Sequence, residues 1–375
     1  MPQIAIDDPD GTLAMLRESV EAFAGQNSGP AAVRSQRKDG GHLDAALWGE
    51  IAAAGWAGLL VSEDHGGAGL GVAEQAILSE ALGRALTPVP LAASNVFAAI
   101  ALSDAGQSVE RDRLLAGIAD GSAIVAPAWQ GSAHSKGRAL SAKADGSGVV
   151  LDDYCYHVDG ASAASDFLVI APCGDEAVLV AVPTGAPGLT VEERAGVDGG
   201  AVATLIFDGC KADAAHVLAR GKSVAALIER PVQYARLALA AELAGIASKA
   251  VELTIAYTKD RVQFGKPIAS FQAIQHRMVE MWSDAEFACA SVANAVNKLN
   301  EGDAAAARLA VLAAKARCGD AATSICRRAV HLHGAMGFTD EHDIGLYLKR
   351  AVSLSATLGQ PERLRLEFVN LERAA

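Results

Sequence analysis

Residues 261–272 read RVQFGKPIASFQ and connect the end of one long predicted helix to the start of the next. Arg261 stands at the helix end, where its guanidinium offers a planar fork of donors suited to phosphate oxygens. Phe264 provides an apolar face, and Gly265 lets the backbone come close to a ligand. Gln272, in the first turns of the next helix, can hydrogen-bond a nucleotide. Two interpretations stay open on these residues alone: a nucleotide-binding segment, or a basic helix end followed by a structural turn.

The hydrophobic pattern divides the chain into three zones. The first repeats apolar residues at helical spacing, the middle one has short alternating runs separated by Gly, Asp and Pro, and the last is helical again. We therefore expect an α+β protein with a helical domain at 1–122, an antiparallel β domain at 123–213 and a helical domain at 214–375. The predicted strands include 149–151, 167–170, 177–182 and 203–207, and the long C-terminal helical segments are 224–259, 270–299, 304–332 and 345–371.

A glycine-rich run at Ser62–Gly71 could form a phosphate cradle. However, no strand clearly precedes it and no Gly-Lys-Ser/Thr sequence follows it, as a phosphate-binding loop would require. A tight loop between two helices is therefore the favoured interpretation.

The composition excludes several classes of protein. The chain has 375 residues, 51% of them hydrophobic and 20% charged, which suits two or three packed domains and argues against wholesale disorder. A net charge of −12 would repel nucleic acids and anionic membranes, so we expect neither as a partner. We find no signal peptide and no uninterrupted run of about 20 apolar residues.

The six cysteines do not have the spacing of a disulfide framework or a zinc site, which favours reduced thiols in a cytoplasmic protein. His331 and His333 are two residues apart, and such residues do not face the same way on a helix. We therefore expect no metal site.

Three motifs together resemble those of the acyl-CoA dehydrogenase family of flavoenzymes. The pattern RxQFGKPIxxFQxxQ at Arg261–Gln275 resembles a signature of that family. His333–His342 is similar to its C-terminal GGxGF segment, and Leu59–Gly69 to its N-terminal helical loop. The motifs occur in the family's order, and the three zones agree with them independently.

The resemblance implies a fold of three parts: an N-terminal helical domain, a middle β-barrel-like domain and a C-terminal four-helix bundle. It implies FAD as the cofactor and an acyl-CoA thioester as the substrate, which loses an α-proton to a base and a β-hydride to the flavin. An electron-transferring flavoprotein is the implied electron acceptor. Members of the family are dimers or, more often, tetramers in which the Arg261 segment holds part of the neighbour's FAD. The residues that match this segment are Arg261, Gln263, Phe264 and Gln272.

The sequence departs from the family at the catalytic base. The spacing from Gly337-Phe338 to Gly359 matches the family's Glu-Gly pair, but the residue before the glycine is Leu358. Some relatives carry the base on the first bundle helix, directly before an arginine. That arginine matches Arg236, which is expected at the substrate, but the residue before it is Ala235. Neither leucine nor alanine can accept a proton.

Other departures concern the flavin. The middle domain of the family has a Thr-Glu-Pro-containing strand, and Val125–Ser132 does not clearly match it. The family's glutamine and second glycine, which help to hold the neighbour's FAD, are His331 and Ala335 here. The segment that serves the neighbour is therefore largely intact, while the chain's own flavin-ring contacts and base look eroded.

This asymmetry suggests the base-lacking subunit of a hetero-oligomer. Residues 337–350 read GFTDEHDIGLYLKR and resemble a bacterial branch of the family that acts on steroid-derived acyl-CoAs as heterotetramers. In that branch one subunit supplies the base and a related subunit completes its FAD site. The alanine-rich segment Ala235–Ala250 would leave room beside the flavin, which favours a bulky substrate.

Two alternatives stay open. The chain could be a self-sufficient dehydrogenase whose base has moved, with Glu229, Glu341 and Glu362 as the carboxylates nearest the motifs in sequence. It could also be a flavin-binding relative that does other chemistry, as desulfinases and monooxygenase-like enzymes do, or a purely structural subunit.

Overall fold

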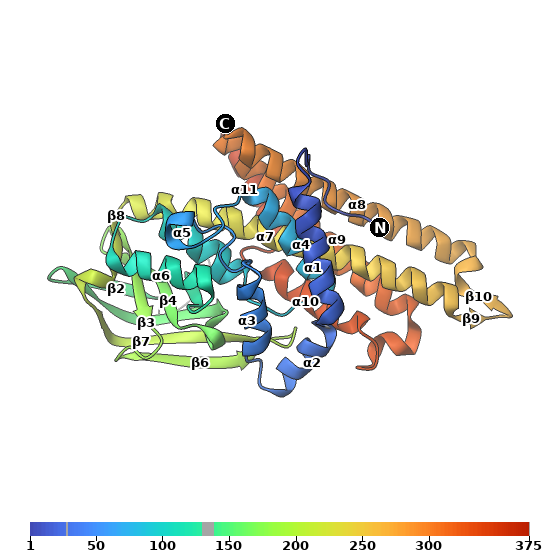
Figure 1. Ribbon diagram of the computed structural model, residues 1–375, viewed down its shortest axis with the longest axis horizontal. Helices are drawn as coiled ribbons and strands as arrows, with labels where there is room; N and C mark the ends of the chain where they lie inside the picture. The colour runs from blue at the N-terminus through green and yellow to red at the C-terminus, as the bar shows by residue number, and fades with distance from the viewer. Residues whose placement is uncertain (28, 130–138, 375) are drawn as a thin grey trace. The chain divides into compact units, whose positions relative to one another are not determined.

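The computed structural model describes residues 1–27, 29–129 and 139–374. Two compact units are formed (Figure 1). Unit 1 comprises Met1–Arg34, Val72–Pro88 and Arg236–Ala375, and unit 2 comprises Ser35–Gly71 and Val89–Ala235. The N-terminal helices are thus divided between the units, and the domain boundaries at 122 and 213 stay a prediction.

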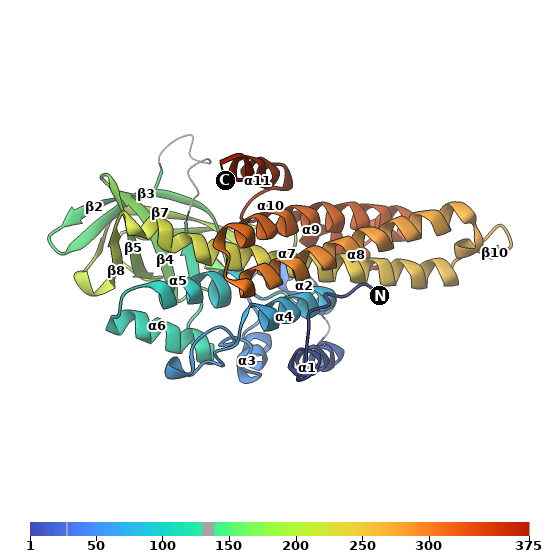
Figure 2. The same cartoon turned by 90° about the horizontal axis from the view of Figure 1, so that it is seen from above.

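Unit 1 is helical. Figure 2 shows the long helices α8 and α9 running side by side with the C-terminal part of α7, which crosses from one unit into the other. The elements of unit 1 are α1 (Thr12–Gln26), α2 (Gly29–Lys38, which crosses the unit boundary), α4 (Val72–Ala85), α7 (Ser223–Asp260, from Arg236 on), β9 (Val262–Gln263), β10 (Lys266–Pro267), η5 (Ile268–Ser270), α8 (Gln272–Glu301), α9 (Ala304–Leu332), η6 (Gly334–Phe338), α10 (Ile344–Ala356) and α11 (Pro361–Ala374).

Small residues let the helices of unit 1 approach closely. A Cβ at Gly245 of α7 would lie 2.1 Å from the carbonyl oxygen of Glu80 in α4, and one at Gly83 would lie 2.4 Å from the carbonyl oxygen of Glu242. Such distances leave no room for a side chain, so only glycine permits this contact between α4 and α7. The abundance of alanine and glycine therefore has a direct structural use: it brings helix backbones together.

Unit 2 combines helices with two four-stranded sheets. The strand orders are β1-β4-β5-β8 and β2-β3-β7-β6, and every pairing is antiparallel except β1 with β4. The elements are α3 (Ala45–Ala53), η1 (Glu63–His65), η2 (Ala92–Ala98), α5 (Ala99–Asp104), α6 (Val109–Asp120), β1 (Val125–Ala128), β2 (Ser141–Asp145), β3 (Gly148–Asp159), η3 (Ala161–Ala163), β4 (Asp166–Cys173), β5 (Glu176–Pro183), β6 (Leu189–Ala195), β7 (Ala201–Ala212), η4 (Ala214–His216) and β8 (Val217–Gly221).

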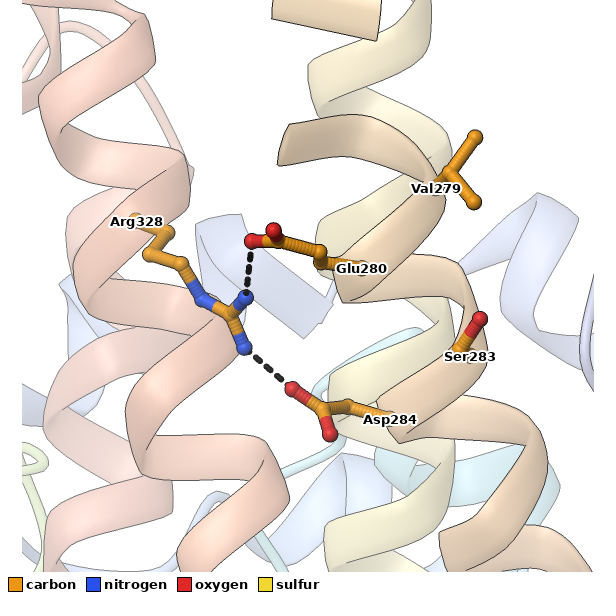
Figure 3. A pocket seen from close by; sticks show the side chains of 5 residues that line it. All are labelled: Val279, Glu280, Ser283, Asp284 and Arg328. Atoms are coloured by element: carbon orange, nitrogen blue, oxygen red, sulfur yellow. Dashed lines mark hydrogen bonds and ion pairs between the residues drawn. The ribbon is translucent and has the colours of Figure 1, made fainter. Parts of the chain in front are cut away.

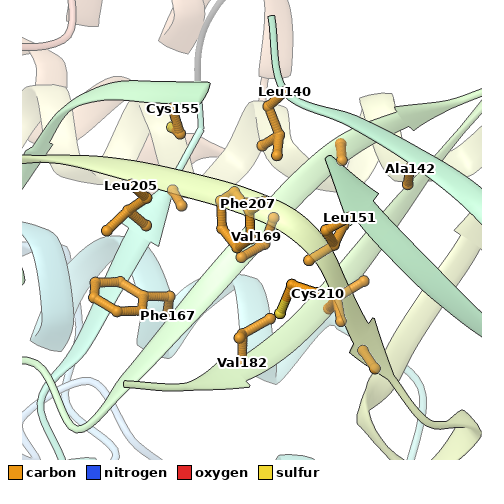
Figure 4. Packing of buried hydrophobic residues seen from close by; sticks show 14 of the residues in the cluster. Leu140, Ala142, Leu151, Cys155, Phe167, Val169, Val182, Leu205, Phe207 and Cys210 are labelled. Atoms are coloured by element: carbon orange, nitrogen blue, oxygen red, sulfur yellow. The ribbon is translucent and has the colours of Figure 1, made fainter. Parts of the chain in front are cut away.

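The two sheets enclose one apolar core (Figure 4). Phe167 and Val169 of β4, Leu151 of β3 and Leu205 of β7 are all completely buried in it. All four predicted strand runs lie in observed strands: 149–151 in β3, 167–170 in β4, 177–182 in β5 and 203–207 in β7. The strands predicted by alternating patterns are therefore confirmed.

The glycine-rich loop at 62–71 lies between α3 and α4, as predicted. Six consecutive amides, those of residues 65–70, each donate to a backbone carbonyl within 3.1 Å. These donors are committed to the loop itself, so they are not available to bind a phosphate.

The predicted helix at 345–371 is wrong in one respect, because it is two helices. Helix α10 ends at Ala356 and α11 begins at Pro361. Between them Leu358 has φ of 53° and Gly359 has φ of 123°, which no continuous α-helix allows. The Gly and Pro of this segment were the available signals. None of the helices in the described part of the chain has both the length and the apolar composition needed to cross a membrane.

Candidate functional site

The first site is the turn that connects α10 to α11, where the base was sought. Leu358 occupies the left-handed region, which costs a non-glycine residue about 1–2 kcal/mol. Its side chain is half-buried. A Cβ at Gly359 would lie 2.6 Å from Leu364 Cδ2, so the next position accepts only glycine without rearrangement. The turn therefore presents an apolar side chain on an unusual and tightly specified backbone.

Arg236 of α7 anchors this turn. Its Nε donates to the carbonyl oxygen of Leu358 at 2.9 Å, and its two terminal nitrogens lie 3.4 and 3.2 Å from the carboxylate oxygens of Glu367 in α11. Arg308 of α9 lies 3.4 Å from the same carboxylate. The Arg236 side chain is only 13% exposed. Its donors serve the turn and Glu367, and the predicted role of Arg236 in substrate binding stays a prediction.

A buried lysine holds the same turn from α9. Lys315 is fully buried, and its Nζ donates to the carbonyl oxygens of Ser355 at 3.1 Å and Gly359 at 3.4 Å. Burial lowers the pKa of its ammonium to about 7, and the charge of Arg236 acts in the same direction. Sequence reasoning missed Lys315. The available signal was a single cation on the apolar face of a helix, between Val311 and Ala322.

In the part of the chain that the structure describes, no carboxylate replaces the missing base at this turn. Ala235 is completely buried. The three alternative carboxylates, Glu229, Glu341 and Glu362, are exposed. Glu367 lies beside the turn through its contact with Arg236, and both of its carboxylate oxygens are engaged by arginines.

The second site lies at the other end of unit 1, where β9 and β10 form a short hairpin. Its two loop residues, Phe264 and Gly265, have φ of 55° and 78°, as a type I′ turn requires. The Phe264 side chain is 91% exposed and meets the edge of Phe271 at a centroid distance of 6.0 Å. Arg261 is also exposed, and within the described residues its guanidinium has no hydrogen bond or ion pair. Gln263 and Gln272 are exposed as well.

The other two cofactor candidates lie at this same end. Tyr257, one turn before Arg261, donates from its hydroxyl to the carbonyl oxygen of His333 at 3.1 Å. His331 and Ala335 flank that residue and are exposed, and Arg277 of α8 lies 3.3 Å from His331 Nδ1. The structure thus brings the six candidates Arg261, Gln263, Phe264, Gln272, His331 and Ala335 to one end of the bundle.

A cluster of three rings supports this end. The His333 ring centroid lies 4.4 Å from that of Tyr257 and 4.3 Å from that of His342, and Tyr257 and His342 meet edge-on at 6.2 Å. The His333 Nδ1 approaches the carbonyl oxygen of Ala329 at 2.7 Å, and its Nε2 is buried without a partner among the described residues. Burial lowers the pKa of both His333 and His342, so both imidazoles are neutral at pH 7. His331 and His333 face different surroundings, as expected for residues two apart.

The two sites are far apart within unit 1. Helix α7 rises about 36 Å from Arg236 to Asp260 at 1.5 Å per residue. A ligand bound at the hairpin is therefore remote from the same chain's Leu358.

A third feature is a shallow groove along α8 and α9 (Figure 3). Arg328 points toward Glu280 and Asp284, and it forms ion pairs with both, at 3.6 Å for Glu280. Val279 and Ser283 complete the lining. Arg317 also pairs with Asp284 at 2.8 Å, so both carboxylates of the groove are engaged in ion pairs.

The strand that did not match the family, β1 at Val125–Ala128, is largely buried, and its first amide donates to Ser94 Oγ at 3.0 Å. Trp129, directly after it, lies 6.0 Å from the ring of Phe97. The rest of the segment, residues 130–132, lies outside the described residues.

Residues 225–368 match the C-terminal domain of acyl-CoA dehydrogenases, and residues 11–122 match the N-terminal domain. The chain belongs to the acyl-CoA dehydrogenase family. This confirms the family and the fold predicted from the sequence. The acyl-CoA dehydrogenases are oxidoreductases that act on the CH–CH bond of acyl-CoA thioesters, and they are FAD-binding flavoproteins.

Several acyl-CoA dehydrogenases resemble the whole chain. It is 32% identical to "Acyl-CoA dehydrogenase IpdE2" of Mycolicibacterium smegmatis over 356 residues, which cover 94% of this chain and 96% of the relative. Two solved structures are similar throughout. The "ChsE4-ChsE5 complex from Mycobacterium tuberculosis" has a TM-score of 0.89 and 27% identity, with 98% of each chain covered. A single-residue variant of the "Tcur3481-Tcur3483 steroid ACAD" has a TM-score of 0.87 and 28% identity, covering 96% of this chain and 98% of that one.

Proposed function

We propose that this chain is the base-lacking subunit of an FAD-dependent acyl-CoA dehydrogenase that works as a hetero-oligomer. The observation that carries the proposal is the contrast between the two ends of unit 1. The turn at the base position is well held but carries Leu358, while the hairpin with Arg261 and Phe264 is exposed. The turn at Leu358 has no acid–base group, whereas the hairpin exposes side chains that can contact FAD bound to a neighbouring subunit.

The hairpin fits FAD bound to a neighbour. Arg261 can pair with a pyrophosphate oxygen, and Phe264 can cover an aromatic ring. His331 and Ala335 lie within the same end and can add contacts to the adenosine side. The cofactor would supply the hydride acceptor. The distance of about 36 Å to the chain's own turn supports binding in trans rather than in cis.

This chain's own residues do not move the α-proton. An α-proton of a thioester is weakly acidic, so a carboxylate must lie within reach of it. Leu358 and Ala235 cannot accept a proton, and both carboxylate oxygens of Glu367 are engaged by arginines. A related subunit that carries glutamate at one of these two positions would provide the base.

The relatives support a hetero-oligomer and a bulky substrate. Two similar structures are named after two chains each, and one of them is called a steroid acyl-CoA dehydrogenase. We infer a steroid-derived acyl-CoA as the substrate class and an electron-transferring flavoprotein as the acceptor. All six cysteines are free thiols, which fits a reducing compartment such as the cytoplasm.

The test is expression of the chain alone and together with a glutamate-bearing paralogue from the same genome. FAD per chain and anaerobic flavin bleaching by linear and steroid-derived acyl-CoAs are then measured. We expect co-purification and bleaching only in the complex, strongest with the bulky thioester. Full activity with one FAD per chain in the lone protein would favour a relocated base. Absence of bleaching in every combination would favour a non-dehydrogenase or structural role.

A further inference from the structure

The turn between α10 and α11 is held by two cations that come from different helices. Lys315 of α9 donates to the carbonyl oxygens of Ser355 and Gly359, and Arg236 of α7 donates to that of Leu358. Three carbonyl groups within five residues are thus fixed from outside the turn.

Lys315 supplies a donor for a carbonyl group at the end of α10. The last carbonyl groups of an α-helix have no partner within the helix, and Ser355 lies one residue before the end of α10. A positive charge at that end also interacts favourably with the helix dipole. Within the described residues no carboxylate forms an ion pair with Lys315, so its hydrogen bonds go to the turn.

The backbone of this turn needs such support. Leu358 lies in the left-handed region, and a residue stays there only when its surroundings fix it. Because the backbone of a residue sets the direction of its Cα–Cβ bond, holding the carbonyls of 355, 358 and 359 also fixes where side chain 358 points. Glu367 neutralises Arg236 and so keeps this cation in place.

We propose that Lys315 is a positioning residue that fixes the Ser355–Gly359 turn and thereby the direction of side chain 358. The link between the turn and the reaction rests on the proposed function, whereas the role of Lys315 in fixing the turn does not. The turn carries no carboxylate at position 358, but the contacts of Lys315 and Arg236 that would orient one are present. We call these contacts the clamp. Accordingly, a carboxylate introduced at position 358 is held in a productive direction, and Lys315 is required for that.

The first experiment tests the clamp without reference to the reaction. Hydrogen exchange of the peptide spanning 353–362 is compared in the unaltered chain, Lys315→Met and Lys315→Gln. Methionine fills the space but cannot donate, whereas glutamine keeps two donors. Lys249→Met, a lysine that pairs with Glu252 at the surface of α7, is the matched control.

We expect exchange in 353–362 to be at least tenfold faster in Lys315→Met, largely restored in Lys315→Gln, and unchanged in α8 and in the control. Unchanged exchange at the turn, or equal acceleration throughout unit 1, would overturn the proposal. If Lys315→Met does not fold while Lys315→Gln folds with native protection, donation is required and the proposal stands. If neither folds, the lysine serves the bundle as a whole and the proposal fails.

The second experiment connects the clamp with catalysis. In the assembled complex, Leu358→Glu is expected to raise the rate of flavin bleaching that depends on this chain's turn at least tenfold over the complex with Leu358. Adding Lys315→Met should lower kcat of that gained activity several-fold and leave KM unchanged, whereas Lys315→Gln should largely preserve it. A KM change alone would contradict a positioning role. No gain from Leu358→Glu would count against the placement of this turn at the reaction, while the exchange experiment still decides the role of Lys315.

Discussion

Arg236 donates a hydrogen bond from Nε to the carbonyl oxygen of Leu358, 122 residues away in the sequence, at 2.9 Å. The contact joins the first long helix of the bundle to the turn between the last two. It places a cation beside the position where the family has its base, and there it holds backbone rather than a carboxylate of the turn. The other partner of Arg236 is Glu367.

Arg236→Leu should lower the free energy of unfolding by about 2–4 kcal/mol. It leaves the Leu358 carbonyl without its donor, and it removes one of the two arginines that pair with the half-buried Glu367. Chemical denaturation measures the loss. Arg308→Leu is the control, because the contact of Arg308 with Glu367 is at 3.4 Å and more exposed, and about 0–1 kcal/mol is expected. Equal losses in both variants would contradict the importance of the Leu358 contact.

Gly359→Ala should destabilise the protein by about 2–4 kcal/mol, because φ of 123° is unfavourable for alanine and the new Cβ would lie 2.6 Å from Leu364 Cδ2. Gly302→Ala is a matched control with φ of 79° and no atom within 4 Å of the new Cβ, and it should cost about 1 kcal/mol. Thermal and urea unfolding compare the two. Similar costs at both positions would argue against tight packing at the turn.

The stability should rise between pH 7 and 8.5 because of Lys315. The folded state releases this proton near pH 7, whereas an unfolded lysine keeps it until about pH 10.4. Over this interval the unfolded state binds more protons, so the free energy of unfolding increases with pH. Lys315→Met should remove this part of the slope in urea denaturation at constant ionic strength. An identical slope in the variant would show that Lys315 does not titrate there.

On the acid side, His333 and His342 should act in the same direction. Burial lowers their pKa in the folded state, so the unfolded state takes up protons first as the pH falls below about 6.5. The free energy of unfolding should therefore fall between pH 6.5 and 5. His333→Phe should flatten this decline, and the Ala329 carbonyl would keep the backbone amide of residue 333 as its donor. Unfolding curves at several pH values test this, and an unaltered decline would point to other groups.

Arg261→Ala should weaken FAD binding in the assembled complex by about 10–100-fold if the guanidinium pairs with phosphate, which corresponds to about 1.4–2.8 kcal/mol. The stability of the isolated chain should not change, because this side chain is exposed. Lys259→Ala removes an exposed cation from the end of the same helix and serves as the control. FAD titration measures both, and equal effects would indicate only a general electrostatic attraction.

The sequence was informative where one local pattern determines one element. Alternating runs located β3, β4, β5 and β7, and the helix predicted at 304–332 has the observed bounds of α9. The motif residues were found because Arg261 and Phe264 belong to one continuous segment. Lys315 was missed because its partners, Ser355 and Gly359, are about 40 residues away and contribute backbone atoms, which no side-chain pattern reveals. The pairing of Arg236 with Glu367 was missed because the two residues are 131 positions apart in the sequence.

The break at Leu358 was missed for a related reason. The apolar spacing continues through 345–371 despite the signals of Gly359 and Pro361, and the backbone dihedral angles show that the chain turns there. A leucine gives no warning of a left-handed conformation, because its propensity for helix is high. Long-range contacts with Lys315 and Arg236 outweigh that preference.

The exposed ring of Phe264 has a consequence for the assembly of the enzyme. In an isolated chain this aromatic side chain stands in water on a two-residue loop, and covering it would release about 1.5–3 kcal/mol. Under the proposed function, what covers it is a cofactor held mainly by another subunit. Subunit association and cofactor loading are then thermodynamically linked, and each must strengthen the other by the same factor. Removing the flavin would therefore weaken the association of the subunits by that factor.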